Sequence, residues 1–189
     1  MNIPYTVERR PDTGVSNVMM GVWLFLASEV MLFGALFSAY ALLRFAAPAW
    51  PSGRQLLSLS SGSVNTLLLL AMTGLVWKAR VAATDRARVL LLFSTLLAGA
   101  FLAVKIVEYR GEIALGLVPA LNTFLATYYT LTGLHALHVV GGMIANLWIV
   151  AGIRRAGTAV SAQRIQAMSL YWAFVDVVWL VIFVLMYLA

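Results

Sequence analysis

The sequence contains five apolar runs, each long enough to cross a membrane. They cover residues 17–43, 56–77, 87–109, 119–151 and 165–188, and segments rich in polar residues, Pro or Gly separate them. A membrane-spanning helix needs about 20 predominantly apolar residues. Because backbone groups in hydrocarbon must be hydrogen-bonded within their own segment, each run is predicted to be a helix. We expect an all-α integral membrane protein, with residues 1–189 forming one membrane domain of five transmembrane helices.

The composition supports this class and argues against several others. Hydrophobic residues make up 62% of the chain and charged residues 11%, whereas soluble domains have about 25% charged residues. The net charge is +6, but the basic residues occur singly or in pairs, so no nucleic-acid partner is expected. The chain has no cysteine, which excludes disulfides, iron–sulfur clusters and thiolate metal sites.

The basic residues predict how the chain is oriented in the membrane. Three lie in segments on the side of the membrane opposite the N-terminus, namely Arg44, Arg54 and Arg110. Nine lie on the N-terminal side, and these are Arg9, Arg10, Lys78, Arg80, Arg86, Arg88, Arg154, Arg155 and Arg164. By the positive-inside rule, the N-terminus is expected in the cytoplasm and the C-terminus outside.

A few polar residues interrupt the apolar runs near their centres. A charged side chain at the bilayer centre costs roughly 2.5–3.5 kcal/mol on insertion scales, so each one needs a compensating partner or a function. Four of the predicted helices place such groups at similar depth, which suggests a buried polar cluster. Its expected members are Glu29, Asn65, His135, His138 and Asp176.

The same residues could also have purely structural roles. Buried polar side chains often join membrane helices, contributing about 0.6–2 kcal/mol per contact. For Glu29, structural pairing and a role in protonation both remain open. His135 and His138 are three residues apart on one helix face, a spacing that could serve a metal. No third ligand accompanies them in the sequence, so we expect no metal site.

Charged residues also occur near the outer end of the third predicted helix. Lys105 and Glu108 are three residues apart and can pair within a helix. We expect this pair mainly as an anchor at the membrane interface, and alternatively as a contact with a partner subunit.

Four segments of the chain carry recognisable motifs. The first holds a Ser-Glu-Val triplet around Glu29, and the third carries a Thr-Gly-x-His-x-x-His pattern ending at His138. The four segments are residues 21–31, 64–66, 132–139 and 171–179. Together they resemble subunit III of the haem–copper respiratory oxidases, and the Glu108-Tyr109 pair also fits that family.

The chain departs from the family pattern in two respects. The long form of the family has seven helices, and a lipid-holding cleft separates the first two from the other five. The runs found here match the last five, as in a short form of cytochrome c oxidase subunit III, and bound phospholipid is one expectation of the resemblance. Ala173 stands where the family usually has histidine, so no role of that histidine transfers.

The resemblance implies an accessory subunit without catalytic residues or cofactors of its own. Haems and copper are then expected in partner subunits, and this chain would pack on the catalytic subunit I, with subunit II in the same complex. It would stabilise a proton-pumping terminal oxidase in a bacterial-type inner membrane and aid proton or oxygen supply. Cytochrome c is the expected electron donor.

Three other functions remain open. The chain could be subunit III of a quinol oxidase or a homologue that accompanies nitric oxide reductase. A more distant alternative is an independent transporter that uses Glu29 and Asp176 as proton-coupling carboxylates.

Overall fold

The computed structural model describes residue 6, residues 8–155 and residues 158–189. Within these ranges the chain is helical and contains no strand, and five helices are long and apolar enough to cross a membrane. This confirms five membrane-spanning helices where they were predicted, with ends that differ by up to seven residues. The elements are α1 (Asn17–Ala46), α2 (Gly53–Leu56), α3 (Leu59–Ala79), α4 (Thr84–Ala114), α5 (Thr123–Gly152), α6 (Thr158–Phe183) and the π-helix η1 (Val184–Leu188). The short helix α2 was not predicted.

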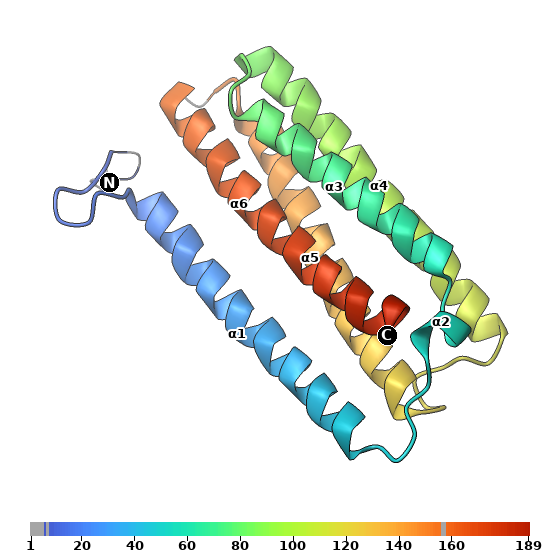
Figure 1. Cartoon of the computed structure of the whole chain (residues 1–189). Coiled ribbons are helices and arrows are strands. Elements are labelled where there is room, and N and C mark those ends of the chain that lie inside the picture. The colour runs from blue at the N-terminus through green and yellow to red at the C-terminus, as the bar shows by residue number, and fades with distance from the viewer. Residues whose placement is uncertain (1–5, 7, 156–157) are drawn as a thin grey trace.

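Helices α3 to α6 form a bundle, and α1 lies along one side of it (Figure 1). Helix α6 packs against α3, α5 and α1. The side chains that α1 buries are Leu26, Phe33 and Tyr40, which recur every seven residues. A repeat of seven places all three on one narrow stripe of the helix. Helix α1 is therefore attached along a single seam.

The starts and ends of the helices follow from local sequence. Ser16, Ser58 and Asn122 cap α1, α3 and α5, and each side-chain oxygen accepts a hydrogen bond from a backbone N–H of the first turn. Helix α4 ends just before Gly116, which has a φ of +75°. Glycine adopts this left-handed conformation without strain, so the chain can turn sharply there. After the turn, the backbone N–H of Leu117 donates to the carbonyl of Glu112 at 2.9 Å.

A close approach of α5 to α6 depends on Gly142. A Cβ atom at this position would lie 2.5 Å from the ring of Trp172 and 2.9 Å from that of Tyr171. Trp172 is fully buried, so its ring has little room to move. We expect Gly142→Ala to destabilise the subunit by about 1–3 kcal/mol through overpacking, seen as a lower melting temperature in detergent.

Gly133→Ala is the matched control, because a Cβ at Gly133 on the same helix meets no atom within 4 Å. Equal melting temperatures for the two variants would contradict the packing argument.

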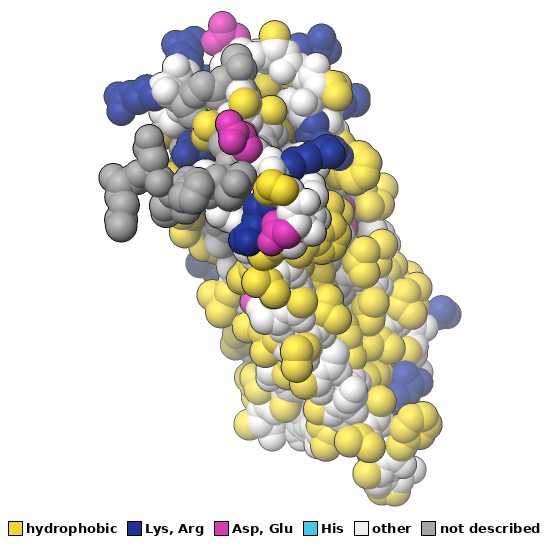
Figure 2. Space-filling view, turned by 90° about the vertical axis from the view of Figure 1, so that its left-hand side faces the viewer, with side chains coloured by type: hydrophobic (Ala, Val, Ile, Leu, Met, Phe, Trp, Pro, Cys, Tyr) yellow, Lys and Arg dark blue, Asp and Glu magenta, His cyan; other side chains and the backbone are white. Residues whose placement is uncertain are grey.

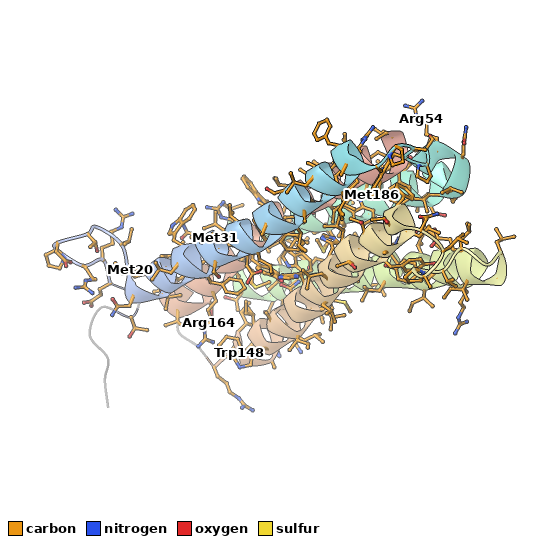
Figure 3. The ribbon with its side chains drawn as sticks, turned by 90° about the horizontal axis from the view of Figure 1, so that it is seen from below. Met20, Met31, Arg54, Trp148, Arg164 and Met186 are labelled. Carbon is orange, nitrogen blue, oxygen red and sulfur yellow. The ribbon has the colours of Figure 1, made fainter. Side chains whose placement is uncertain are left out.

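The C-terminal end of α6 continues as η1, where donors from other elements hold its backbone. The hydroxyl of Tyr40 on α1 donates to the carbonyl of Leu185 at 3.0 Å. Arg54 on α2 donates through Nε to the carbonyl of Leu188, also at 3.0 Å. Figure 3 shows Arg54 and Met186 at this same end of the molecule. These contacts fix η1 against α1 and α2.

Candidate functional site

Glu29 on α1 meets His138 on α5. The carboxylate oxygen Oε2 lies 2.8 Å from Nε2 of the imidazole, and each side chain is only 14% exposed. The ring of Phe33, one turn further along α1, packs edge-on against the same imidazole at 5.0 Å. Tyr171 on α6 donates its hydroxyl to the carbonyl of His138 at 2.7 Å. Three helices therefore converge on this pair.

The second nitrogen of His138 determines how protons are distributed in the pair. Nδ1 lies 2.9 Å from the carbonyl oxygen of Leu134, which can only accept a hydrogen bond. We therefore assign a proton to Nδ1. The contact between Nε2 and Glu29 then requires one further proton between the two residues, on either side. In both arrangements the pair is neutral overall, which offsets the cost of an acid in the membrane.

The Glu29–His138 contact gives a prediction that separates hydrogen bonding from charge. Glu29→Gln can still hydrogen-bond to Nε2, so the subunit should keep nearly its full thermal stability. Glu29→Leu leaves the buried imidazole nitrogen without a partner and should cost about 1–3 kcal/mol. Melting temperatures in detergent compare the two, and Glu29→Leu combined with His138→Leu should recover part of the loss. A Gln variant as unstable as the Leu variant would contradict the prediction.

His135 lies one turn from His138 but in a different environment. Its ring contacts Phe101 at a centroid distance of 5.6 Å and Trp179 at 5.2 Å. The side chain is fully buried, and neither ring nitrogen has a hydrogen-bond partner among the described residues. His135 therefore packs as an aromatic ring between α4 and α6.

Asn65 and Asp176 lie elsewhere in the bundle. Asn65 on α3 is fully buried, and its amide atoms have no hydrogen-bond partner in the described part of the chain. Asp176 on α6 has Thr73 of α3 as its polar neighbour. The Thr73 hydroxyl and the Oδ1 atom of Asp176 make no hydrogen bond of ordinary geometry with described residues. Asp176 thus faces α3, whereas Glu29 faces α5.

The structure therefore joins two of the five central residues and separates the other three. Glu29 and His138 are hydrogen-bonded, while Asn65, His135 and Asp176 make no described hydrogen bond to them or to one another. The reason is rotational: similar depth in the membrane does not bring side chains together when their helices turn them toward different neighbours.

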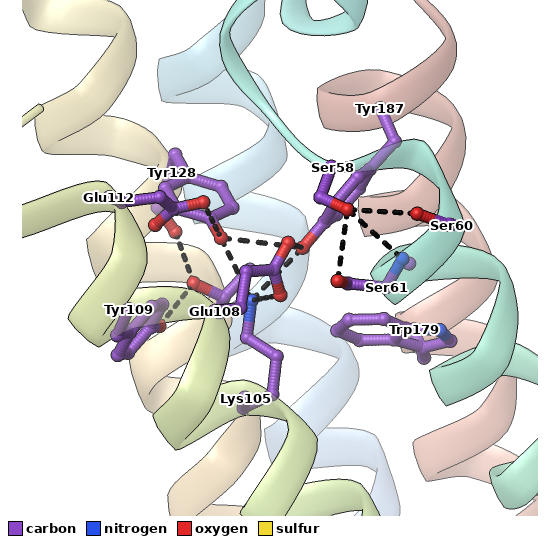
Figure 4. A network of polar contacts seen from close by, with 12 residues as sticks. Ser58, Ser60, Ser61, Lys105, Glu108, Tyr109, Glu112, Tyr128, Trp179 and Tyr187 are labelled. Carbon is purple, nitrogen blue, oxygen red and sulfur yellow. Dashed lines mark hydrogen bonds and ion pairs between the residues drawn. The ribbon is translucent and has the colours of Figure 1, made fainter. Parts of the chain in front are cut away.

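A larger polar network surrounds Lys105 (Figure 4). Its ammonium donates to Oε2 of Glu108 at 2.8 Å, to the hydroxyl of Tyr128 at 2.9 Å and to that of Tyr187 at 3.0 Å. Tyr128 donates in turn to Oε1 of Glu112, and Tyr187 donates to Oε1 of Glu108, both at 2.9 Å. We call these five residues the Lys105 cluster; they join α4, α5 and η1.

Aromatic rings enclose the ammonium of Lys105. The rings of Tyr109 and Tyr128 lie 4.6 and 4.8 Å from Nζ, and those of Tyr187 and Trp179 lie 5.7 and 5.9 Å away. The electron-rich ring faces attract a cation at these distances, most strongly where water is excluded.

The position of the Lys105–Glu108 pair corrects the sequence interpretation. The pair forms, but the two side chains are only 3% and 2% exposed, so they are not an anchor at the membrane interface. All three ammonium donors bond to groups inside the bundle, which explains why Lys105 turns inward instead of extending to the surface.

Sequence reasoning missed two members of the cluster. Glu112 lies one helical turn after Glu108, and the spacing of Lys105, Glu108 and Glu112 already predicts one charged stripe on the helix. Tyr128 and Tyr187 carried no comparable signal, because tyrosine is common near membrane interfaces. Only the packing of α5 and η1 on α4 brings their hydroxyls to Lys105.

Comparison with known proteins identifies the family. Residues 11–189 match the profile described as cytochrome c oxidase subunit III. Subunit 3 of the cytochrome bo(3) ubiquinol oxidase of Pseudomonas aeruginosa is 35% identical over 182 residues, covering 94% of this chain and 87% of that protein. Cytochrome c oxidase subunit 3 of Synechocystis sp. is 37% identical over 177 residues, covering 90% of this chain and 75% of that protein. Heme-copper oxidase subunit I+III of Aeropyrum pernix is 33% identical over 201 residues, covering 98% of this chain and 24% of that protein.

The chain belongs to the cytochrome c oxidase subunit III family, as its motifs predicted. Its relatives are subunits III of both cytochrome c oxidases and bo(3) quinol oxidases, and an accessory role is consistent with this family. The five apolar helices and the bacterial relatives show a multi-pass membrane protein of the bacterial plasma membrane.

Proposed function

We propose that this chain is the accessory subunit of a proton-pumping terminal oxidase, and that it packs on and stabilises the catalytic subunit I. The observation that carries the proposal is the family match over residues 11–189. A relative named heme-copper oxidase subunit I+III, which aligns with 98% of this chain, supports direct contact with subunit I. Subunit II completes the proposed complex.

The same proposal assigns the redox cofactors to partner subunits. Among the described residues, no three His, Asp or Glu side chains come together as metal ligands would. In this proposal the chain binds no haem or copper, forms one membrane domain, and contributes to proton or oxygen supply only through the complex. Bound phospholipid would fill grooves against its apolar faces.

Purification tests the proposal directly. An affinity tag on this chain should isolate a complex containing subunits I and II, with a haem spectrum and oxygen consumption. Without this chain, the haem spectrum should persist while the yield or sustained turnover of the complex falls. A chain that purifies alone, and that moves a solute in response to a pH gradient when reconstituted, would overturn the proposal in favour of an independent transporter.

The electron donor is a separate part of the proposal. The Ser-Glu-Val triplet and the Glu108-Tyr109 pair favour cytochrome c. Subunit 3 of a ubiquinol oxidase aligns with 94% of this chain, and this favours quinol as the second candidate. Oxygen consumption by the purified complex with reduced cytochrome c, and separately with ubiquinol, decides between them.

We further propose that the N-terminus lies in the cytoplasm and the C-terminus outside. The support is the distribution of charge: Lys and Arg side chains gather at the end that holds the N-terminal segment, and apolar side chains cover the surface below it (Figure 2). The turns between α3 and α4 and between α5 and α6 lie at that same end (Figure 1). Alkaline phosphatase fused after Ala189 should be active, and the same enzyme fused in the α3–α4 turn inactive. The reverse pattern would overturn this orientation.

A further inference from the structure

The Lys105 cluster has one fewer hydrogen-bond donor than its buried acceptor oxygens need. The ammonium has three hydrogens, and Glu108, Tyr128 and Tyr187 accept all three. Each of the two tyrosines has a single hydroxyl hydrogen, and each donates it to a carboxylate oxygen. No hydrogen of these groups is left for the remaining oxygen of Glu112.

The hydrogens of the neighbouring hydroxyl groups are also used in hydrogen bonds to other residues. Thr132 donates to the carbonyl of Tyr128, so the hydroxyl hydrogen of Tyr109 goes to the Thr132 oxygen at 2.5 Å. Tyr129 donates to the carbonyl of Leu117 at 2.9 Å. Because its single hydrogen is used in that bond, the Tyr129 hydroxyl can only accept a hydrogen bond from Glu112.

Glu112 is accordingly a buried acid with one unmatched oxygen. The residue is only 5% exposed, and its Oε2 atom has no hydrogen-bond donor among the described residues. A buried carboxylate oxygen without a donor is costly, and more so when the group carries its full charge.

The charge balance of the Lys105 cluster also favours a proton on Glu112. With both acids ionised, the cluster would hold two negative charges against the single positive charge of Lys105. Glu108 receives the ammonium and the Tyr187 hydroxyl, whereas Glu112 receives only the Tyr128 hydroxyl. A proton on Glu112 makes the cluster neutral and lets its O–H donate toward Tyr129.

We propose that Glu112 is a proton-binding site, and that the Lys105 cluster holds one exchangeable proton there at neutral pH. The titratable and charged groups that face it are Lys105, Glu108 and Tyr109 from α4, Tyr128 and Tyr129 from α5, and Tyr187 from η1. Release of this proton leaves a net negative charge inside the bundle.

Infrared spectroscopy of the purified full-length protein, in its complex, tests the site. The protonated acid should give a carboxylic C=O stretching band at neutral pH that shifts in heavy water and is lost in Glu112→Gln. Asp85→Asn, which removes an exposed carboxylate outside the cluster, is the control and should leave that band in place. If the Glu112→Gln variant loses no band, Glu112 is ionised and the proposal is overturned.

Thermal stability gives a second, independent readout. Glu112→Gln replaces a neutral acid with a neutral amide, so the melting temperature at neutral pH should stay near that of the unmodified protein. Glu108→Gln removes the carboxylate that balances Lys105 and should lower it by several degrees. Equal losses in the two variants would overturn the proposal.

The pH dependence has a definite sign. The folded cluster holds a proton that a carboxyl of the unfolded chain in water releases, so raising the pH favours unfolding. The unmodified protein should lose melting temperature toward alkaline pH more steeply than Glu112→Gln. Identical slopes in the two proteins would contradict a proton bound at Glu112.

Discussion

Lys105→Met should destabilise the folded subunit by about 3–5 kcal/mol. Methionine keeps much of the length and volume of the lysine stem but lacks the ammonium. Glu108 would then stay buried at 2% exposure without its cation, and the hydroxyls of Tyr128 and Tyr187 would lose a donor. The expected readout is a large drop in the melting temperature of the subunit, or its loss from the purified complex.

The chain provides a matched control in its other lysine. Lys78 lies exposed at the end of α3, and Lys78→Met should change stability little. Combining Lys105→Met with Glu108→Gln should restore part of the loss, since removing both charges of a buried pair is far less costly than removing one. A single Lys105→Met variant with the melting temperature of the unmodified protein would show that the ammonium does not hold these helices together.

Trp179→Ala is expected to cost about 3–5 kcal/mol because it opens a large cavity at the centre of the bundle. Trp179 is 1% exposed, packs edge-to-face against Phe101 at a centroid distance of 4.9 Å and donates its indole N–H to Thr66 at 3.0 Å. It also lies beside the Lys105 ammonium and the Tyr187 ring, so its loss removes packing from α3, α4 and η1 together. Chemical or thermal unfolding of the purified subunit measures the effect.

Two other tryptophan variants show whether burial or ring size causes the loss of stability. Trp179→Phe keeps a ring but loses the hydrogen bond to Thr66, and should cost clearly less than Trp179→Ala. Trp23→Ala removes a side chain of the same size that is 55% exposed on α1, and should change the stability of the isolated subunit little. A loss for Trp23→Ala as large as that for Trp179→Ala would mean that ring size, not burial, sets the cost.

The spans could be predicted because length and apolarity alone define them. Each of the five runs contains enough apolar residues to cross the hydrocarbon core, and the ends of the helices differ from the predicted ends by at most seven residues. The Lys105–Glu108 contact was also predictable, since neighbours three apart meet on any helix.

The partners across helices were not predictable in the same way. Soluble helices show an apolar stripe that reveals which face is buried, but membrane helices are apolar on every side. The sequence therefore placed Glu29 and Asp176 at similar depth without indicating that one faces α5 and the other α3. For the same reason, nothing in the sequence signalled that Lys105 turns inward or that Tyr128 and Tyr187 meet it.

The π-helix η1 makes the Lys105 cluster sensitive to the number of residues, not only to their identity. A π-turn bonds residues five apart where an α-turn bonds residues four apart, so it shifts the rotational frame of everything that follows. Tyr187 lies inside η1 and bonds to Glu108 and Lys105 in that frame. Deleting one residue from Val184–Met186, before the tyrosine, would turn Tyr187 away from both, although no member of the cluster had been changed.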